Sequence, residues 1–235
     1  MIRLYFYVEG QTEQQYVETV FREHLAGFQV YVEGAILAAT GRRHGVVSRG
    51  GGRHFPPMKN DLARLLRQHK GSEVRFTTMF DLYALYSDFP GTEEASKQLH
   101  DPRQRINLLE RAFAEEMNDA RLIPHIQLFE FETILYCNLD AFEIHYASCR
   151  RQIDALKEDA GQQVFDPELI DDGQHTAPSK RIAKQFHDFP AAKPDAPVAI
   201  ATMIDLATIR GKCPPFNLWL TRLEQLDSGT TAAIS

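Results

Sequence analysis

The feature that most constrains the fold is the opening run Ile2–Val8, whose residues are nearly all aromatic, aliphatic or β-branched. Such a run is typical of a strand that is buried on both faces of a parallel sheet. Gly10 then provides a turn, Thr12 and Gln15 stand at the spacing of a helix capping box, and Gly27 marks the end of the helix. A strand, a tight turn and a helix within so short a segment predict an α/β fold.

Two further strands are predicted downstream, over residues 73–85 and 122–129. Pro124 interrupts the later one, which places that strand near a sheet edge. Between the strands we expect one helix opened by Pro57 and another with Asp101 as its N-cap. Residues 28–38 indicate either a strand pair or one strand with a bulge. Alternating strands and helices predict a parallel sheet, in which sites gather at the carboxyl ends of the strands.

The second half of the chain has a helical character. Residues 133–156 are expected to be helical, and 165–235 to form short helices separated by prolines. We therefore predict an α/β domain over residues 1–138, a parallel sheet flanked by helices, with a helical C-terminal extension over 139–235 packed on it. Trp219 is expected to anchor this extension on the core, and His125 to be packed and hydrogen bonded.

Composition excludes several classes of protein. No apolar stretch approaches the ~20 residues that span a bilayer, and the opening run lacks the pattern of a signal peptide. Cys137, Cys149 and Cys213 form no C-x-x-C pair, so a disulfide framework and a zinc cluster are both disfavoured, and a cytoplasmic location is expected. Because the formal net charge is −6, a polyanion would need a local basic patch or a bridging metal ion.

Acidic residues follow the predicted strands. Glu9, Asp81 and Glu130 fall at strand ends, and Glu13 and Glu132 are close enough in sequence to act as second ligands. Mg²⁺ and Mn²⁺ favour such carboxylate oxygens, and two-metal phosphodiesterases use them to activate water and to stabilise the leaving oxygen. The alternative is structural, because acids after strands also serve as turn residues, helix caps and partners of the helix dipole.

Basic residues form two groups. Residues 40–55 are rich in Gly and cations and lack an apolar period, which predicts a flexible basic loop able to wrap a phosphate backbone. A second group follows Ser179. The predicted nucleic-acid contacts are Arg42, Arg43, Arg49, Arg53, Lys180 and Arg181. Both groups are also compatible with plain solvated segments. No phosphate-binding P-loop is present, so any ATPase would be another chain.

The stretch Leu4–Glu13, with Glu-Gly-Gln-Thr-Glu after a strand, resembles the first motif of Toprim domains, above all that of overcoming-lysogenization-defect (OLD) nucleases. More closely, the whole chain resembles the domain of unknown function 4276 family, which is taken here as Toprim-like. The matching stretches are the Glu-Gly-x-Thr-Glu start, Phe80-Asp81-Leu82-Tyr83 followed by Phe89-Pro90-Gly91, Glu130-Phe131-Glu132-Thr133-Ile134-Leu135, Thr176-Ala177-Pro178-Ser179-Lys180-Arg181, and Cys213-Pro214-Pro215-Phe216-Asn217-Leu218-Trp219.

The Toprim resemblance implies Mg²⁺- or Mn²⁺-dependent strand cleavage, with Glu9 and Asp81 as the catalytic residues that bind metal or shuttle protons. One departure is Tyr83, which stands where the second Asp of the family's Asp-x-Asp motif would be. Its ligand role would pass to Asp88 or Glu130. Related nucleases occur with ATPase partners in defence against phage, so the resemblance suggests that setting here.

Two hypotheses of different class follow. The first is a metal-dependent nuclease acting on DNA or RNA, an effector in an ATPase-coupled defence system. The second is a non-catalytic, Toprim-derived partner that binds an ATPase or nucleic acid, as the missing second Asp and the negative net charge suggest. A small phosphate ester is a third substrate class, and a homodimer is compatible with either hypothesis.

Overall fold

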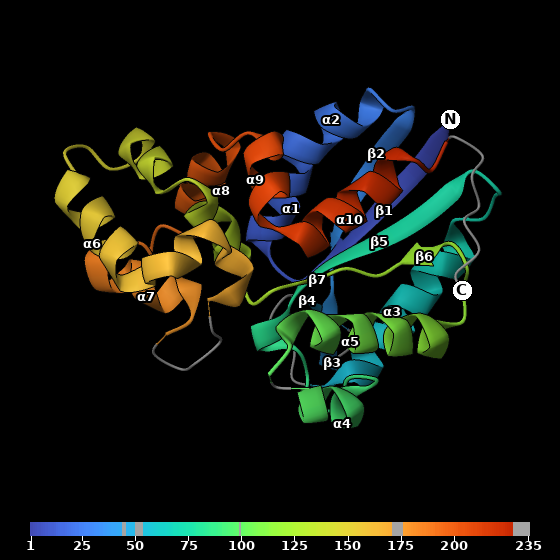
Figure 1. Cartoon of the computed structure of the whole chain (residues 1–235). Helices are drawn as coiled ribbons and strands as arrows, with labels where there is room; N and C mark the ends of the chain where they lie inside the picture. The colour runs from blue at the N-terminus through green and yellow to red at the C-terminus, as the bar shows by residue number, and fades with distance from the viewer. Residues whose placement is uncertain (44–45, 50–53, 99, 171–175, 228–235) are drawn as a thin grey trace.

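A computed structural model of the chain describes residues 1–43, 46–49, 54–98, 100–170 and 176–227. For 39–43 and 46–49 it describes the backbone alone. Its centre is a five-stranded parallel sheet in the order β2-β1-β5-β6, with β7 also paired to β5 (Figure 1). The strands are β1 (Ile2–Val8), β2 (Val30–Leu37), β5 (Val74–Asp81), β6 (Leu122–Ile123) and β7 (Ile126–Gln127). The predicted α/β fold with a parallel sheet flanked by helices is confirmed.

The register aligns the carboxyl ends of three strands. Val8 at the end of β1 lies opposite Leu37 of β2 and opposite Met79 of β5. The pairing of β1 with β2 shifts register between Leu4 and Tyr5. The range 28–38 is therefore one strand with an irregularity, which was one of the two readings that the sequence left open.

Successive side chains of β1 alternate between two apolar cores, as a strand buried on both faces requires. Leu4 and Phe6 enter one core and Tyr5 and Tyr7 the other. In Figure 1, α1, α2 and α10 cover one face of the sheet, and α3 and α5 cover the other. The helices are α1 (Gln11–Tyr16), a π-helical turn Val17–Phe21, α2 (Arg22–Ala26), α3 (Phe55–Gln68), α4 (Thr92–Ala95), α5 (Pro102–Met117), α6 (Arg150–Ala160), α7 (Pro178–Gln185), α8 (Asp195–Thr202), α9 (Leu206–Lys212) and α10 (Pro214–Glu224).

The region after β7 is largely helical, as expected for 133–156, but it is not one continuous α-helix. It forms two 3₁₀ segments, Phe131–Cys137 and Leu139–Ile144, before α6 begins. The side chain of Asn138 accepts the backbone N–H of Asp140, and such a local bond competes with continued helix. Downstream, Pro178 and Pro214 open α7 and α10, as expected for short helices punctuated by prolines.

The predicted anchoring role of Trp219 is confirmed. Its indole stacks on the His125 ring with centroids 4.0 Å apart, and its Nε1–H donates to Thr77 Oγ1 at 2.8 Å. One apolar core contains residues of β1 together with residues of the region 139–235, including Phe216 and Leu220. The division into 1–138 and 139–235 stays a prediction.

The prediction of a loop over 40–55 is wrong for the described residues of that range. They form β3 (Ala39–Arg43) and β4 (Val46–Arg49), which pair as a two-stranded antiparallel sheet, and the start of α3, while 44–45 and 50–53 lie outside the described residues. The β-branched pair Val46-Val47 is typical of a strand, but the basic and Gly-rich composition around it led to the prediction of a loop. Within the described ranges, none of the helices combines the length and apolar character that a bilayer span requires.

Candidate functional site

The site begins with Glu9 and Asp81, which the sheet brings together. Glu9 follows the last residue of β1, and its backbone N–H donates to Met79 O at 3.3 Å, which extends the pairing with β5. The backbone N–H of Asp81 donates to Glu9 Oε2 at 3.1 Å. Two acids separated by 72 residues in sequence are therefore neighbours at the carboxyl edge of the sheet, where the sequence predicted a site.

Glu13 joins them through the turn between β1 and α1. Its Oε2 accepts the backbone N–H of Gly10 at 2.8 Å. A Cβ atom at position 10 would lie 2.8 Å from that same oxygen, so Gly10 leaves room for the carboxylate. The helix is thus capped from Glu13, and not through the predicted pair of Thr12 and Gln15. Sequence spacing found a capping pattern but assigned it two residues too late.

Glu130 is held by the C-terminal half of the chain. Ser179, in the first turn of α7, donates its backbone N–H to Glu130 Oε2 at 2.8 Å and its hydroxyl to Glu130 Oε1 at 2.9 Å. A carboxylate at the N-terminus of a helix is also favoured by the helix dipole. Both oxygens of Glu130 therefore already have strong hydrogen-bond donors.

Glu132 is paired with Lys193, a residue that sequence analysis missed. The Lys193 ammonium forms an ion pair with Glu132 Oε1, and Glu132 itself is 2% exposed. Lys193 precedes Pro194 and α8 in a segment with no motif around it, so no sequence signal singled it out. In Figure 1, α7 and α8 lie beyond the carboxyl ends of β1 and β5, which explains how they reach the acids.

The acids form one electrostatic unit. Burial raises the pKa of Glu9 to about 7, with the charge of Glu130 adding to the rise and the Asp81 N–H opposing it. Burial likewise raises the pKa of Glu13 to about 7, and the charges of Glu9 and Glu132 add to it. These effects act only between groups that are close, because charge interactions fall with distance and are screened by solvent.

Asp81 lies at the centre of this unit. Burial raises its pKa well above the ordinary range, and all four neighbouring acids, Glu13, Glu9, Glu132 and Glu130, add to the rise. Its Oδ1 atom is buried and has no hydrogen-bond partner. A buried, unpartnered carboxylate oxygen is costly, which points to a missing cation or proton.

Lys193 balances part of this charge. Burial lowers its pKa, but the charges of Glu132, Glu130 and Asp81 outweigh burial and the pKa is raised. Glu9 and Asp81 keep partial solvent access, whereas Glu13, Glu130 and Glu132 are buried. An incoming ligand can therefore meet Glu9 and Asp81 first. Within the described residues, no three acidic, histidine or cysteine side chains are yet arranged to hold a metal ion.

Asp88 and Glu130, which the Toprim resemblance offers as replacements for an acid at position 83, have different surroundings. Tyr83 itself is 41% exposed. Asp88 Oδ1 accepts the backbone N–H of Phe55 at 2.9 Å and so stabilises the start of α3. Of the two candidates, Glu130 is the one whose charge acts on both Glu9 and Asp81.

The two predicted nucleic-acid contacts on α7 have different surroundings. Lys180 is exposed on α7, beside Ser179. Arg181 is buried and donates to Thr176 O at 2.6 Å and to Asp159 Oδ2 at 3.0 Å, so its guanidinium is engaged inside the protein and its predicted role in nucleic-acid binding is not supported.

The remaining predicted contacts lie in or near the β3–β4 hairpin. Arg42, Arg43 and Arg49 belong to its strands, and Arg53 lies outside the described residues. The hairpin follows β2 at the acid-bearing edge, where the backbone N–H of Ala38 donates to Val8 O at 2.8 Å.

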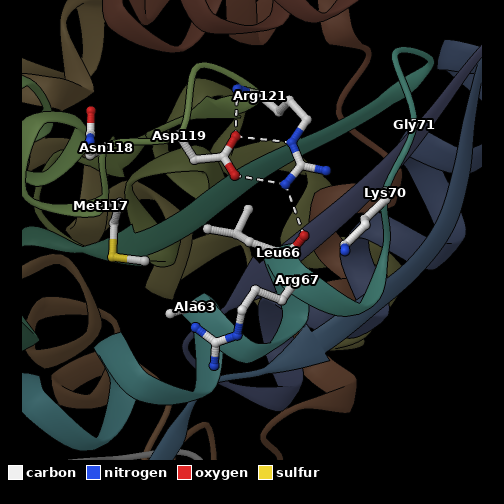
Figure 2. A pocket seen from close by; sticks show the side chains of 9 residues that line it. All are labelled: Ala63, Leu66, Arg67, Lys70, Gly71, Met117, Asn118, Asp119 and Arg121. Atoms are coloured by element: carbon white, nitrogen blue, oxygen red, sulfur yellow. Dashed lines mark hydrogen bonds and ion pairs between the residues drawn. The ribbon is translucent and has the colours of Figure 1, made fainter.

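A separate pocket lies at the opposite edge of the sheet, where β5 and β6 begin (Figure 2). Figure 2 shows Asp119 and Arg121 paired there, and Arg121 also donates to Leu66 O at 2.8 Å. Arg67 and Lys70 line the same pocket near the C-terminus of α3, where cations complement the helix dipole. It contains none of the five clustered acids.

Comparison with known proteins gives one family. The family described as "Domain of unknown function (DUF4276)" matches residues 8–224, nearly the whole chain. Neither the curated proteins nor the solved structures give a significant match.

Proposed function

Because the chain belongs to the domain of unknown function 4276 family, whose description gives no activity, we propose its function from the site: a Mg²⁺- or Mn²⁺-dependent nuclease that cleaves phosphodiester bonds of DNA or RNA. The observation that carries the proposal is the cluster of Glu9, Glu13, Asp81, Glu130 and Glu132 around the buried, unpartnered Oδ1 of Asp81. Five neighbouring carboxyl groups can all be ionised only when positive charge offsets them, and only Lys193 supplies it among the described residues whose contacts include these acids.

The chemistry of the residues fits a hard divalent cation, because carboxylate oxygens are the ligands that Mg²⁺ and Mn²⁺ prefer. Asp81, Glu9 and Glu13 would hold the ion after a rearrangement, since no three such side chains among the described residues are arranged for a metal. When bound, such an ion supplies charge neutralisation for a phosphodiester and acidifies water. Asp81 and Glu9 keep solvent access, so they are the groups that can meet substrate. With a pKa of about 7, Glu9 can accept or release a proton near neutral pH.

The phosphate backbone would approach from the β3–β4 hairpin and from α7. Arg42, Arg43 and Arg49 lie on the hairpin that leaves the acid-bearing edge, and Lys180 is exposed next to Ser179. Such cations position a backbone without reading sequence. An ATPase partner, a role in phage defence, a cytoplasmic location and a homodimer belong to the proposal only through the resemblance to OLD-family nucleases and the cysteine pattern.

The test is cleavage of single- and double-stranded DNA and RNA by the purified chain with Mg²⁺, Mn²⁺ or EDTA. We expect cleavage that requires the divalent ion. Asp81→Asn should lower the rate at least about 100-fold, because changes even outside the ligand shell cost 10–100-fold. Asp119→Asn, in the pocket at the other edge, is the matched control and should retain activity. Cleavage by the Asp81→Asn variant at the wild-type rate would refute the assignment.

A second candidate, a non-catalytic module that binds an ATPase or nucleic acid, is favoured by one observation. Tyr83 replaces an acid and Lys193 already neutralises Glu132, so fewer acidic ligands remain than in the Asp-x-Asp pattern. Nucleic-acid binding without turnover, together with no Mn²⁺ uptake in calorimetry, would favour this candidate. Turnover of a small phosphate ester alone would instead favour the third substrate class.

A further inference from the structure

We propose that Lys193 acts as a built-in cation of the acidic site, so that the five carboxylates take up one divalent ion and not two. The inference rests on the proposed function and specifies its metal content. It divides the cluster into two halves, one open to metal and one already neutralised by the protein.

The neutralised half consists of Glu130 and Glu132. Ser179 donates to both oxygens of Glu130, at 2.8 and 2.9 Å. The Lys193 ammonium pairs with Glu132 Oε1, and its charge also acts with that of Glu130. A divalent ion on this side would have to displace the ammonium and break the Ser179 bonds. Glu130 is therefore a positioning residue that fixes α7 against the site.

The open half consists of Glu9, Glu13 and Asp81. Glu9 Oε2 and Glu13 Oε2 each accept one backbone N–H, from Asp81 and from Gly10, which fixes the direction of both carboxylates. Asp81 Oδ1 is buried and has no partner, although it lies beside four other acids. Oriented ligands next to an unpartnered oxygen are what a cation site requires before it is filled.

The position of Tyr83 agrees with this division. A second ion would need acids that are not already committed, and the residue two positions after Asp81 is an exposed tyrosine. An ammonium and a divalent ion repel each other and cannot share the same carboxylate oxygens.

The test is a calorimetric titration of the full chain with Mn²⁺ near pH 7.5. We expect one Mn²⁺ per wild-type chain and two per chain in Lys193→Met, with the second bound at least about 10-fold more tightly than any second Mn²⁺ of the wild type. Lys193→Arg keeps the positive charge and should stay at one. Lys184→Met, an exposed lysine on α7, is the matched control and should also stay at one.

A second measurement keeps the proposal testable if the Lys193→Met variant folds poorly. Thermal unfolding of Lys193→Gln should occur at a lower temperature than that of the wild type, because Glu132 is left buried and unpaired. Mn²⁺ should raise that temperature more than it raises that of the wild type. An equal Mn²⁺ effect on both proteins would count against the built-in cation.

The outcomes separate the two proposals. Two Mn²⁺ per wild-type chain, or one per chain in both wild type and Lys193→Met, overturns the lysine assignment and leaves the metal-dependent function standing. No Mn²⁺ in the wild type but one in Lys193→Met overturns the count of one ion and removes the metal from the proposed function, and it leaves Lys193 only as the group that neutralises Glu132. No uptake by either protein overturns both.

Discussion

At Glu9 and Glu13, burial raises the pKa of the carboxyl group from 4.5 to about 7. Between these values the folded protein holds protons that the unfolded chain has released. Stability must then fall as pH rises through this window, because the folded state binds the extra protons. The direction is opposite to that of an acid held in a salt bridge. Burial also raises the pKa of Glu110 to about 7 and of Glu168 to about 8, so a variant at Glu9 is needed to assign the effect to this cluster.

The first prediction concerns pH. Without divalent ions, the free energy of unfolding should decrease as pH rises from 4.5 to about 7. Denaturant unfolding at pH 5 and pH 8 measures the difference, and Glu9→Gln should reduce it because that position no longer ionises. Added Mn²⁺ should restore stability at pH 8. An unfolding free energy that is equal at both pH values in wild type and variant would contradict the shared burial of these acids.

The second prediction concerns the bond between α7 and Glu130. Ser179→Ala removes the hydroxyl that donates to Glu130 Oε1 and keeps the backbone donor. Hydrogen bonds to charged groups contribute about 1.5–3 kcal/mol, so the free energy of unfolding should fall by that amount. Ser96→Ala, which removes an exposed bond to a carbonyl, should change it by less than about 0.5 kcal/mol. Denaturant titration compares the two variants directly.

At the scale of elements, α10 is joined to the sheet by the Trp219 side chain. Trp219→Phe keeps an aromatic ring but removes the N–H that donates to Thr77 Oγ1 at 2.8 Å. Loss of that bond and of part of the stack on His125 should lower the free energy of unfolding by about 1–3 kcal/mol. Leu218→Ala, a neighbour that is 67% exposed, should have an effect within about 0.5 kcal/mol. Equal losses in both variants would show that the indole contact is unimportant.

Elements with a strong local pattern were predictable. The Ile2–Val8 strand, the Asp101 cap, which accepts the Gln104 N–H at 2.9 Å, and the edge position of the strand around Pro124 all follow from short-range chemistry. Three of the acids could be proposed for the same reason, since Glu9 follows β1, Asp81 ends β5 and Glu130 lies shortly after β7. The break between the two 3₁₀ segments within 133–156 was not predictable, because the bond of Asn138 to Asp140 N–H, which favours a turn, has no pattern of its own.

The roles of residues that are set by long-range packing could not be predicted from the sequence. Lys193 lies between Ala192 and Pro194 in a segment whose composition is that of a linker. The packing of α8 against α1 and against the 3₁₀ segment Phe131–Cys137 brings it near the acids. Arg181 was misjudged for the same reason, because its sequence looks like part of a basic cluster while the fold buries it against Asp159. Sequence analysis proposed the acids of the site and missed the lysine that pairs with Glu132.

On the scale of the whole molecule, the site spans both halves of the chain. The apolar core that contains β1 also contains Phe216 and Leu220, and Ser179 and Lys193 complete the acidic cluster. A fragment of residues 1–138 would leave that core face open and the acids without their donors. We expect the fragment to unfold without a cooperative transition in near-ultraviolet circular dichroism and to take up no Mn²⁺ in calorimetry. A cooperative melt with wild-type Mn²⁺ affinity would show that 1–138 is a complete unit.

The order of these residues along the chain has a consequence for synthesis. A ribosome releases all five acids before it releases the lysine that offsets them, because Glu132 precedes Lys193 by 61 positions. Until the last fifth of the polypeptide emerges, the nascent chain lacks the lysine that pairs with Glu132. A prematurely terminated product would therefore lack both this positive charge and the C-terminal residues, including Phe216 and Leu220, that complete the apolar core around β1.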